Sequence, residues 1–174
     1  YRKHYIQIIT MIISLLVLII GKKIKFDLIH AHFMYRPGYI AAVLGRILDK
    51  PVVVTAHGSD IHQNLYDESG LFRKRTINTM RWTRGIIGVS QSLKNMIAEE
   101  GFGYKTFVIP AGFSGSKFFA MDTKECRDKL FLDTNIKILL FIGNLVAVKG
   151  VDILIKAFKI VQSKMDNAEL MVIG

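Results

Sequence analysis

Short apolar runs alternate with helical stretches from Lys25 to the end of the chain, and this alternation constrains the fold most. The runs are rich in β-branched residues, which is typical of strands that are buried on both faces. Strands that alternate with helices predict an α/β fold with parallel sheets and helices on both faces. The expected strands are 26–31, 51–56, 85–89, 105–109, 136–142 and 168–173, and the expected helices are 37–48, 70–83, 91–100, 123–132 and 151–164.

The alternation is interrupted at residues 110–117, Pro-Ala-Gly-Phe-Ser-Gly-Ser-Lys, which have the composition of a loop. We therefore expect the later part of one Rossmann-like domain at 1–112, a linker with a connecting helix at 113–135, and the start of a second domain at 136–174. The chain begins at Tyr1 and stops directly after a strand-like run. For that reason we expect the first domain to be incomplete at its N-terminus and the second to be truncated.

Segment 5–20 is almost entirely apolar, and its polar residues Gln7, Thr10 and Ser14 form one narrow stripe on a helix. Its length of 16 residues is shorter than the roughly 20 that are needed to span a bilayer. We expect a mostly buried helix that Gly21 closes at its C-terminus. Docking on a membrane surface and a signal or anchor segment remain the alternatives.

The charge balance is strongly basic, with 24 Lys and Arg against 14 Asp and Glu, a formal net charge of +10. Such a balance favours anionic partners. The basic residues are scattered over predicted helices and are not interleaved with aromatic residues, so we expect a solvated helix face and no nucleic acid. Docking on an anionic membrane surface is the alternative. The single cysteine, Cys126, excludes an internal disulfide and a cysteine-based zinc site, which favours a cytoplasmic setting.

Three candidate site segments follow predicted strands, where ligands bind in open α/β sheets. His57 and Gly58 follow strand 51–56, and a histidine there can bind a ligand or transfer a proton. Ser90 follows strand 85–89 and is first of all a helix N-cap, with a ligand contact as its second interpretation. Alternatively, His57 satisfies backbone groups of its own loop.

The third segment, 141–150, runs from a strand through a short loop into a helix. Its Gly143, Asn144, Lys149 and Gly150 suit an anion site, because a helix N-terminus with a nearby lysine attracts phosphate. The spacing matches neither a Walker A loop nor Gly-x-Gly-x-x-Gly. A helix-entry turn with a solvated lysine is the alternative.

A metal-dependent hydrolase is a second hypothesis. His30 and His32 have equal parity on a predicted strand, so they share one face, and with His57 they could ligate a metal. No second His-x-His pair or downstream histidine cluster follows, so we expect no metal site. A non-catalytic basic module that binds a membrane surface is a third hypothesis.

Taken in order, segments 26–32, 51–61, 89–92, 108–112 and 142–158 resemble family 4 glycosyltransferases. The resemblance implies a GT-B fold of two facing Rossmann-like domains. It also implies a retaining glycosyltransferase of the hexosyl type that works in polysaccharide biosynthesis. Such an enzyme takes a sugar from a nucleotide-diphosphate donor, as a substrate and without a cofactor, to a glycan or lipid-linked acceptor. With the basic first half, this suggests a peripheral position at the inner face of the cell membrane.

The resemblance also implies roles for individual residues. His57 matches the histidine that contacts the donor sugar and takes part in catalysis, and Gly58 stands beside it. Lys149 matches the lysine that neutralises the donor diphosphate, in a loop that Gly143 and Gly150 shape. Ser90 lies in a segment near the cleft between the domains.

Two departures from the family pattern matter. Asn144 stands where the family usually has arginine, so a charged and bidentate donor contact is absent at that position. The first Gly-rich loop and the Glu-x7-Glu motif of the family are not in this sequence. We therefore expect the chain alone to be inactive.

Overall fold

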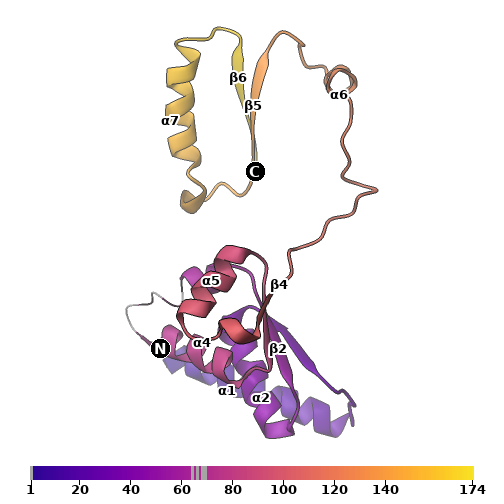
Figure 1. Cartoon of the computed structure of the whole chain (residues 1–174), viewed down its shortest axis with the longest axis vertical. Helices are drawn as coiled ribbons and strands as arrows, with labels where there is room; N and C mark the ends of the chain where they lie inside the picture. The colour runs from indigo at the N-terminus through magenta and orange to yellow at the C-terminus, as the bar shows by residue number, and fades with distance from the viewer. Residues whose placement is uncertain (1, 64, 66, 68–69) are drawn as a thin grey trace. The chain divides into compact units, whose positions relative to one another are not determined.

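The computed structural model describes residues 2–63, 65, 67 and 70–174, which form two compact units (Figure 1). Unit 1 is Tyr1–Gly112 and unit 2 is Phe113–Gly174. Both units contain parallel strands connected through helices, so the predicted α/β class is confirmed.

Unit 1 holds a four-stranded parallel sheet in the order β1-β2-β3-β4. In the register of this sheet, Ala31 pairs with Val54 and Ala56 pairs with Gly88. The first strand begins at Ile29 and not at the predicted residue 26, because its ladder starts where Ile29 N donates to Pro51 O. The strands are β1 Ile29–His32, β2 Val52–Ala56, β3 Gly85–Gly88 and β4 Thr106–Val108.

Helices cover this sheet in the alternating order that the sequence predicts, with α2 against β1 and β2 and α5 against β3 and β4. A π-helical turn, η1 Met34–Gly38, replaces the start of the predicted helix 37–48. Ser90 caps α5 as predicted, with its hydroxyl accepting from Leu93 N at 3.3 Å. The helical elements of unit 1 are α1 Arg2–Gly21, η1, α2 Tyr39–Leu48, α3 Ser59–His62, α4 Leu71–Trp82, α5 Gln91–Glu99 and the 3-10 turn η2 Gly103–Lys105.

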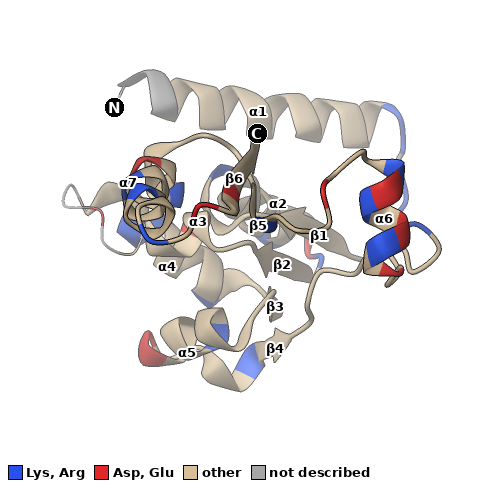
Figure 2. Ribbon diagram, turned by 90° about the horizontal axis from the view of Figure 1, so that it is seen from above, with Lys and Arg blue, Asp and Glu red and all other residues tan. Residues whose placement is uncertain are grey.

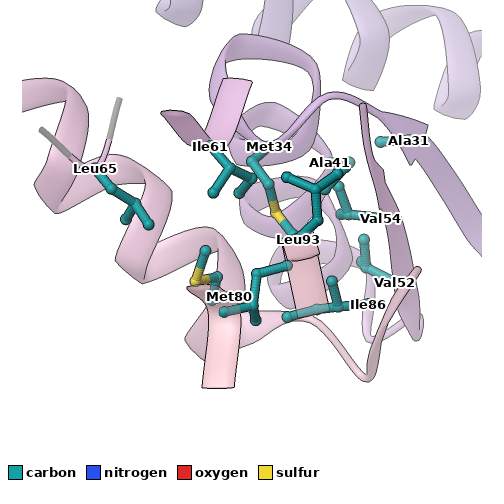
Figure 3. Packing of buried hydrophobic residues seen from close by; sticks show 12 residues of the cluster. Ala31, Met34, Ala41, Val52, Val54, Ile61, Leu65, Met80, Ile86 and Leu93 are labelled. Carbon is teal, nitrogen blue, oxygen red and sulfur yellow. The ribbon is translucent and has the colours of Figure 1, made fainter. Parts of the chain in front are cut away.

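The core of unit 1 lies between these helices and the apolar side chains of β2 (Figure 3). Val52 and Val54 alternate inward along β2, while Met80 from α4 and Leu93 from α5 pack into the same cluster. Each fully buried apolar side chain of this kind stabilises the fold by roughly 1.5–3 kcal/mol. The packing of this core therefore fixes the position of the sheet and of the loops that follow its strands.

Helix α1 differs from the prediction, because it is mostly exposed. Ile8 is buried and packs with α2, whereas Ile13 and Val17 are 56% and 66% exposed. The polar stripe of Gln7, Thr10 and Ser14 lines a cavity that also contains Arg36 and Ile40. These polar residues are themselves exposed, and the side of α1 that packs against α2 is apolar, with Ile8, Ile12 and Leu16. Figure 2 shows the ribbon of α1 in tan up to the lysines that follow it, because residues 5–21 contain no charged side chain.

The end of α1 also departs from the prediction. Gly21 is the last helical residue, but the left-handed residue of the cap is Lys23, with φ 49°. Ile24 N donates to Ile19 O and Lys23 N to Ile20 O, which is a Schellman cap shifted beyond the glycine. None of the helices in the described part of the chain is long and apolar enough to cross a bilayer.

Unit 2 is a βαβ arrangement in which β5 and β6 pair in parallel and α7 connects them. The predicted helix 123–132 ends early, at Lys129, because Phe131 is left-handed with φ 55° and Leu132 N turns back to Arg127 O. The elements are α6 Thr123–Lys129, β5 Lys137–Ile142, the 3-10 turn η3 Ala147–Lys149, α7 Val151–Gln162 and β6 Ala168–Ile173.

Candidate functional site

Three predicted site segments of unit 1 meet at one edge of its sheet. His32 is the last residue of β1, His57 directly follows β2, and Ser90 lies two residues beyond β3. Because the three strands are parallel and adjacent, their carboxyl ends lie at the same edge. The structure therefore brings the β1, β2 and β3 loops together there.

The carboxylate of Asp60 organises this edge. It is 6% exposed, and its Oδ1 accepts from His57 N at 3.0 Å and from Gly58 N at 2.9 Å. Its Oδ2 accepts from Met34 N at 2.7 Å, in the loop that follows β1. One buried side chain thus ties the β1 loop to the β2 loop, with charge-assisted bonds that are stronger than neutral ones.

Gly58 makes the sharp turn between His57 and Asp60 possible. Its φ of 114° lies in a region that L side chains rarely adopt, so a glycine is required there. Its carbonyl oxygen accepts from Ile61 N and His62 N and so begins α3. The conformation of Gly58 therefore brings the backbone N–H groups of both loop residues onto the same carboxylate oxygen.

The imidazole of His57 lies between two side chains of the β1 loop. His57 Nε2 is 2.9 Å from His32 Nδ1, and the Phe33 ring centroid is 4.7 Å from that of His57. Nδ1 of His57 has no hydrogen-bond partner among the described residues. Since the side chain is exposed, this nitrogen can donate to or accept from a ligand.

The β1 loop carries backbone strain next to His57. Phe33 has φ 72° and Arg36 has φ 57°, both unusual for residues other than glycine. Phe33 N donates to Thr55 O at 2.8 Å, which holds the strained residue against β2. Strain of this kind costs about 1–3 kcal/mol per residue and clusters at functional sites.

The predicted anion loop lies in unit 2, between β5 and α7. Gly143 N donates to Ile173 O at 3.0 Å, and Gly150 is left-handed with φ 66° directly before α7. Lys149 ends η3 and is exposed, and within the described part of the chain its ammonium has no hydrogen bond or ion pair. The loop therefore presents a free cation and the exposed Asn144 beside the first turn of α7.

The three histidines of the hydrolase hypothesis lie close together, but their nitrogens bond to neighbouring side chains. His30 Nε2 is 2.9 Å from Thr55 Oγ1, and His32 Nδ1 is 2.9 Å from His57 Nε2. Across the described residues, no three His, Cys, Asp or Glu side chains are arranged to hold a metal ion. Partial burial lowers the pKa of Lys105, which directly precedes β4 and so lies away from the carboxyl edge of the sheet.

Sequence reasoning missed the pairing of His32 with His57 and the anchoring role of Asp60. It also missed Arg75, which is 4% exposed and lies with its guanidinium carbon 4.3 Å from the Tyr5 ring centroid. The contacts of His32 with His57, of Asp60 with Met34 and of Arg75 with Tyr5 each join residues that are far apart in the sequence. The parity and parallel order of β1 and β2 would have indicated only that His32 and His57 share an edge.

Two family models match the chain. "Glycosyltransferase Family 4" matches residues 2–114 and "Glycosyl transferases group 1" matches residues 122–174. The chain is 30% identical over 152 residues to a Bacillus subtilis protein named as a teichuronic acid biosynthesis glycosyltransferase. This match covers 85% of the chain and 37% of that relative, so the chain spans less than half of the relative's length.

Solved structures share the fold. Anabaena HepE, solved with UDP, superposes with a TM-score of 0.65 at 18% identity, over 86% of this chain and 49% of its own. A second HepE structure contains UDP-glucose and gives a TM-score of 0.63 at 22% identity, over 84% of this chain and 39% of its own. A UDP-GlcNAc 2-epimerase of Methanocaldococcus jannaschii gives 0.56 at 12% identity, over 95% of this chain and 47% of its own. Because transfer and epimerisation occur on one architecture, the fold alone does not select the reaction.

Proposed function

Because the chain belongs to glycosyltransferase family 4, we propose that the protein is a retaining hexosyltransferase of polysaccharide biosynthesis. Its donor is a nucleotide-diphosphate sugar, and its acceptor is a glycan or a lipid-linked acceptor. The observation that carries this proposal is the carboxyl edge of β2. There, Asp60 holds the backbone of His57 and Gly58 while His57 Nδ1 stays open to a ligand.

A uridine nucleotide sugar is the donor class that we propose, and UDP-glucose is the probe. Support comes from Anabaena HepE, which has been solved with UDP and with UDP-glucose. The name of the Bacillus subtilis relative, which refers to teichuronic acid biosynthesis, supports a polysaccharide product. The donor is consumed as a substrate, so the proposal includes no cofactor.

In the proposed reaction the bond between the anomeric carbon and the diphosphate oxygen breaks, and its electron pair leaves with the diphosphate. An acceptor hydroxyl oxygen bonds to the anomeric carbon on the same face, and its proton passes to the leaving phosphate oxygen. Negative charge therefore grows on the diphosphate in the transition state. A fixed cation at that position lowers the barrier more than it strengthens substrate binding.

We assign the residues as follows. Lys149 neutralises the diphosphate, Asn144 donates a neutral hydrogen bond to it, and Gly143 and Gly150 shape their loop. His57 is the catalytic residue at the donor sugar. Gly58 also contributes to donor binding, because its conformation presents His57. Ser90, at the same edge of the sheet, is the remaining donor-binding residue that we propose.

We also propose that the protein is peripheral at the inner face of the cell membrane and binds anionic lipid there. On α1, Ile6, Ile13 and Val17 fall on one side at about 100° per residue, and all three are more than half exposed. Lys22 and Lys23 follow the helix directly. An exposed apolar stripe flanked by lysines suits the interface of an anionic bilayer.

The test is the Lys149→Ala variant of the intact transferase, assayed for turnover of UDP-glucose. Loss of the positive charge at the leaving group should lower kcat by roughly 100- to 1000-fold. Lys156→Ala is the matched control, because Lys156 is also exposed and lies on α7 of the same unit. Equal activity of the two variants would refute the assignment of Lys149.

A further inference from the structure

The side chain of His57 is exposed, so burial does not fix the orientation of its ring. What holds the ring is the contact of its Nε2 with His32 Nδ1 at 2.9 Å, with Phe33 on another side. The main chain brings the two histidines together, because His32 pairs with Thr55 in the parallel register and His57 lies two residues beyond Thr55. Both backbones are themselves anchored to the sheet or to Asp60.

The 2.9 Å contact has room for one proton between two nitrogens, so one imidazole donates and the other accepts. In a neutral imidazole only one of the two nitrogens carries a proton. The contact therefore couples the two rings: if Nε2 of neutral His57 donates, its Nδ1 is an acceptor, and if Nε2 accepts, its Nδ1 is a donor. The same contact also sets the direction in which Nδ1 points.

We propose that His32 is a positioning residue for His57. It holds the ring and selects the tautomer, so that Nδ1 meets the donor sugar in one defined state. This inference rests on the proposed function, in which His57 contacts that sugar. His30 does not share the role, because its Nε2 contacts Thr55 Oγ1 at 2.9 Å and not His57.

The geometry of the contact suggests a sharp substitution test. The amide group of asparagine occupies about the position of an imidazole Nδ1, whereas the amide of glutamine reaches about the position of Nε2. Because the contact uses Nδ1 of His32, His32→Asn should keep most of the activity. His32→Gln and His32→Ala should lose about tenfold in kcat, the size expected for one hydrogen bond.

Binding measurements separate positioning from a general loss of structure. UDP lacks the sugar that His57 contacts, so UDP should bind the intact His32→Ala transferase as it binds the wild type. UDP-glucose should bind the variant several-fold more weakly. His30→Asn is the matched control on the same strand and should leave both affinities within about twofold. Equal weakening of UDP and UDP-glucose by His32→Ala would overturn the proposal.

Nitrogen NMR of the histidine rings tests the contact without any assay of activity. We expect one tautomer of His57 in the wild type and a mixture of tautomers in His32→Ala. The amide of His32→Asn can donate or accept, so this variant should keep the position of the ring without selecting a tautomer. Unchanged ring signals of His57 in His32→Ala would overturn the inference. Full turnover by His57→Ala would refute the catalytic assignment of His57. A changed tautomer of His57 in His32→Ala would still support the contact between the two rings.

Discussion

Replacing Asp60 by asparagine should destabilise unit 1 strongly, although the side chain keeps its shape. The carboxylate accepts from His57 N and Gly58 N through Oδ1 and from Met34 N through Oδ2. An asparagine has one acceptor oxygen, so its amide nitrogen must face an N–H group on one of the two sides. If the oxygen stays toward His57 and Gly58, the N–H of the fully buried Met34 loses its acceptor.

The size of the effect follows from two contributions. A hydrogen bond to a charged group contributes about 1.5–3 kcal/mol, and an unsatisfied buried N–H costs about 1–3 kcal/mol. Because the two overlap in part, we expect a loss of about 3 kcal/mol in the free energy of unfolding. With a urea m-value of about 1.5 kcal/mol/M, the midpoint should fall by about 2 M.

Urea unfolding followed by the fluorescence of Trp82 measures this loss, because Trp82 is the single tryptophan of the chain and ends α4 of unit 1. Asp49→Asn is the matched control. Asp49 is exposed and left-handed with φ 51°, a conformation that asparagine tolerates, so its midpoint should stay close to that of the wild type. A midpoint of Asp60→Asn equal to that of Asp49→Asn would refute the account of this loop.

Two further predictions concern Lys105 and α1. Burial lowers the pKa of Lys105 below its ordinary value of 10.5, so just below pH 10.5 the unfolded chain binds more protons than the folded one. The stability of the wild type relative to Lys105→Met should therefore rise with pH through that window, and urea midpoints that fall instead would contradict this. Replacing both Ile13 and Val17 by serine should weaken binding to phosphatidylglycerol vesicles about 100-fold. The control Ile47→Ser, at an exposed position on α2, should bind as the wild type does. Equal binding of the wild type, the double variant and the control in a flotation assay would exclude α1 as the docking surface.

The class of the fold and the positions of its strands could be predicted from the sequence, because β-branched runs such as Val52–Val54 report burial directly. The ends of the helices and strands could not be predicted in this way. The cap of α1 lies at Lys23 and α6 stops before Phe131, and both depend on left-handed residues that are not glycine. Propensity predicts glycine at such positions, so the exceptions are found only in the three-dimensional structure.

The candidate site divides in the same way. His57, Gly58 and Ser90 could be placed at one edge from the sequence, since the carboxyl ends of parallel strands coincide, and their roles stay predictions. The functions of Asp60 and His32 could not be derived, because each depends on a contact with a residue on another element. Knowing that two loops share an edge does not determine which of their atoms come within 3 Å.

The error on α1 has a different cause. Segment 5–20 is almost entirely apolar, which predicts a mostly buried helix, since a helix that is apolar on all sides is usually buried. In the structure only one side of α1, with Ile8 buried, packs against α2, whereas Ile13 and Val17 on another side are more than half exposed. Composition shows that a helix is almost entirely apolar, but it does not show which of its sides has a neighbour to pack against. An apolar stripe that ends in lysines at Lys22 and Lys23 is consistent with a face that meets an anionic bilayer.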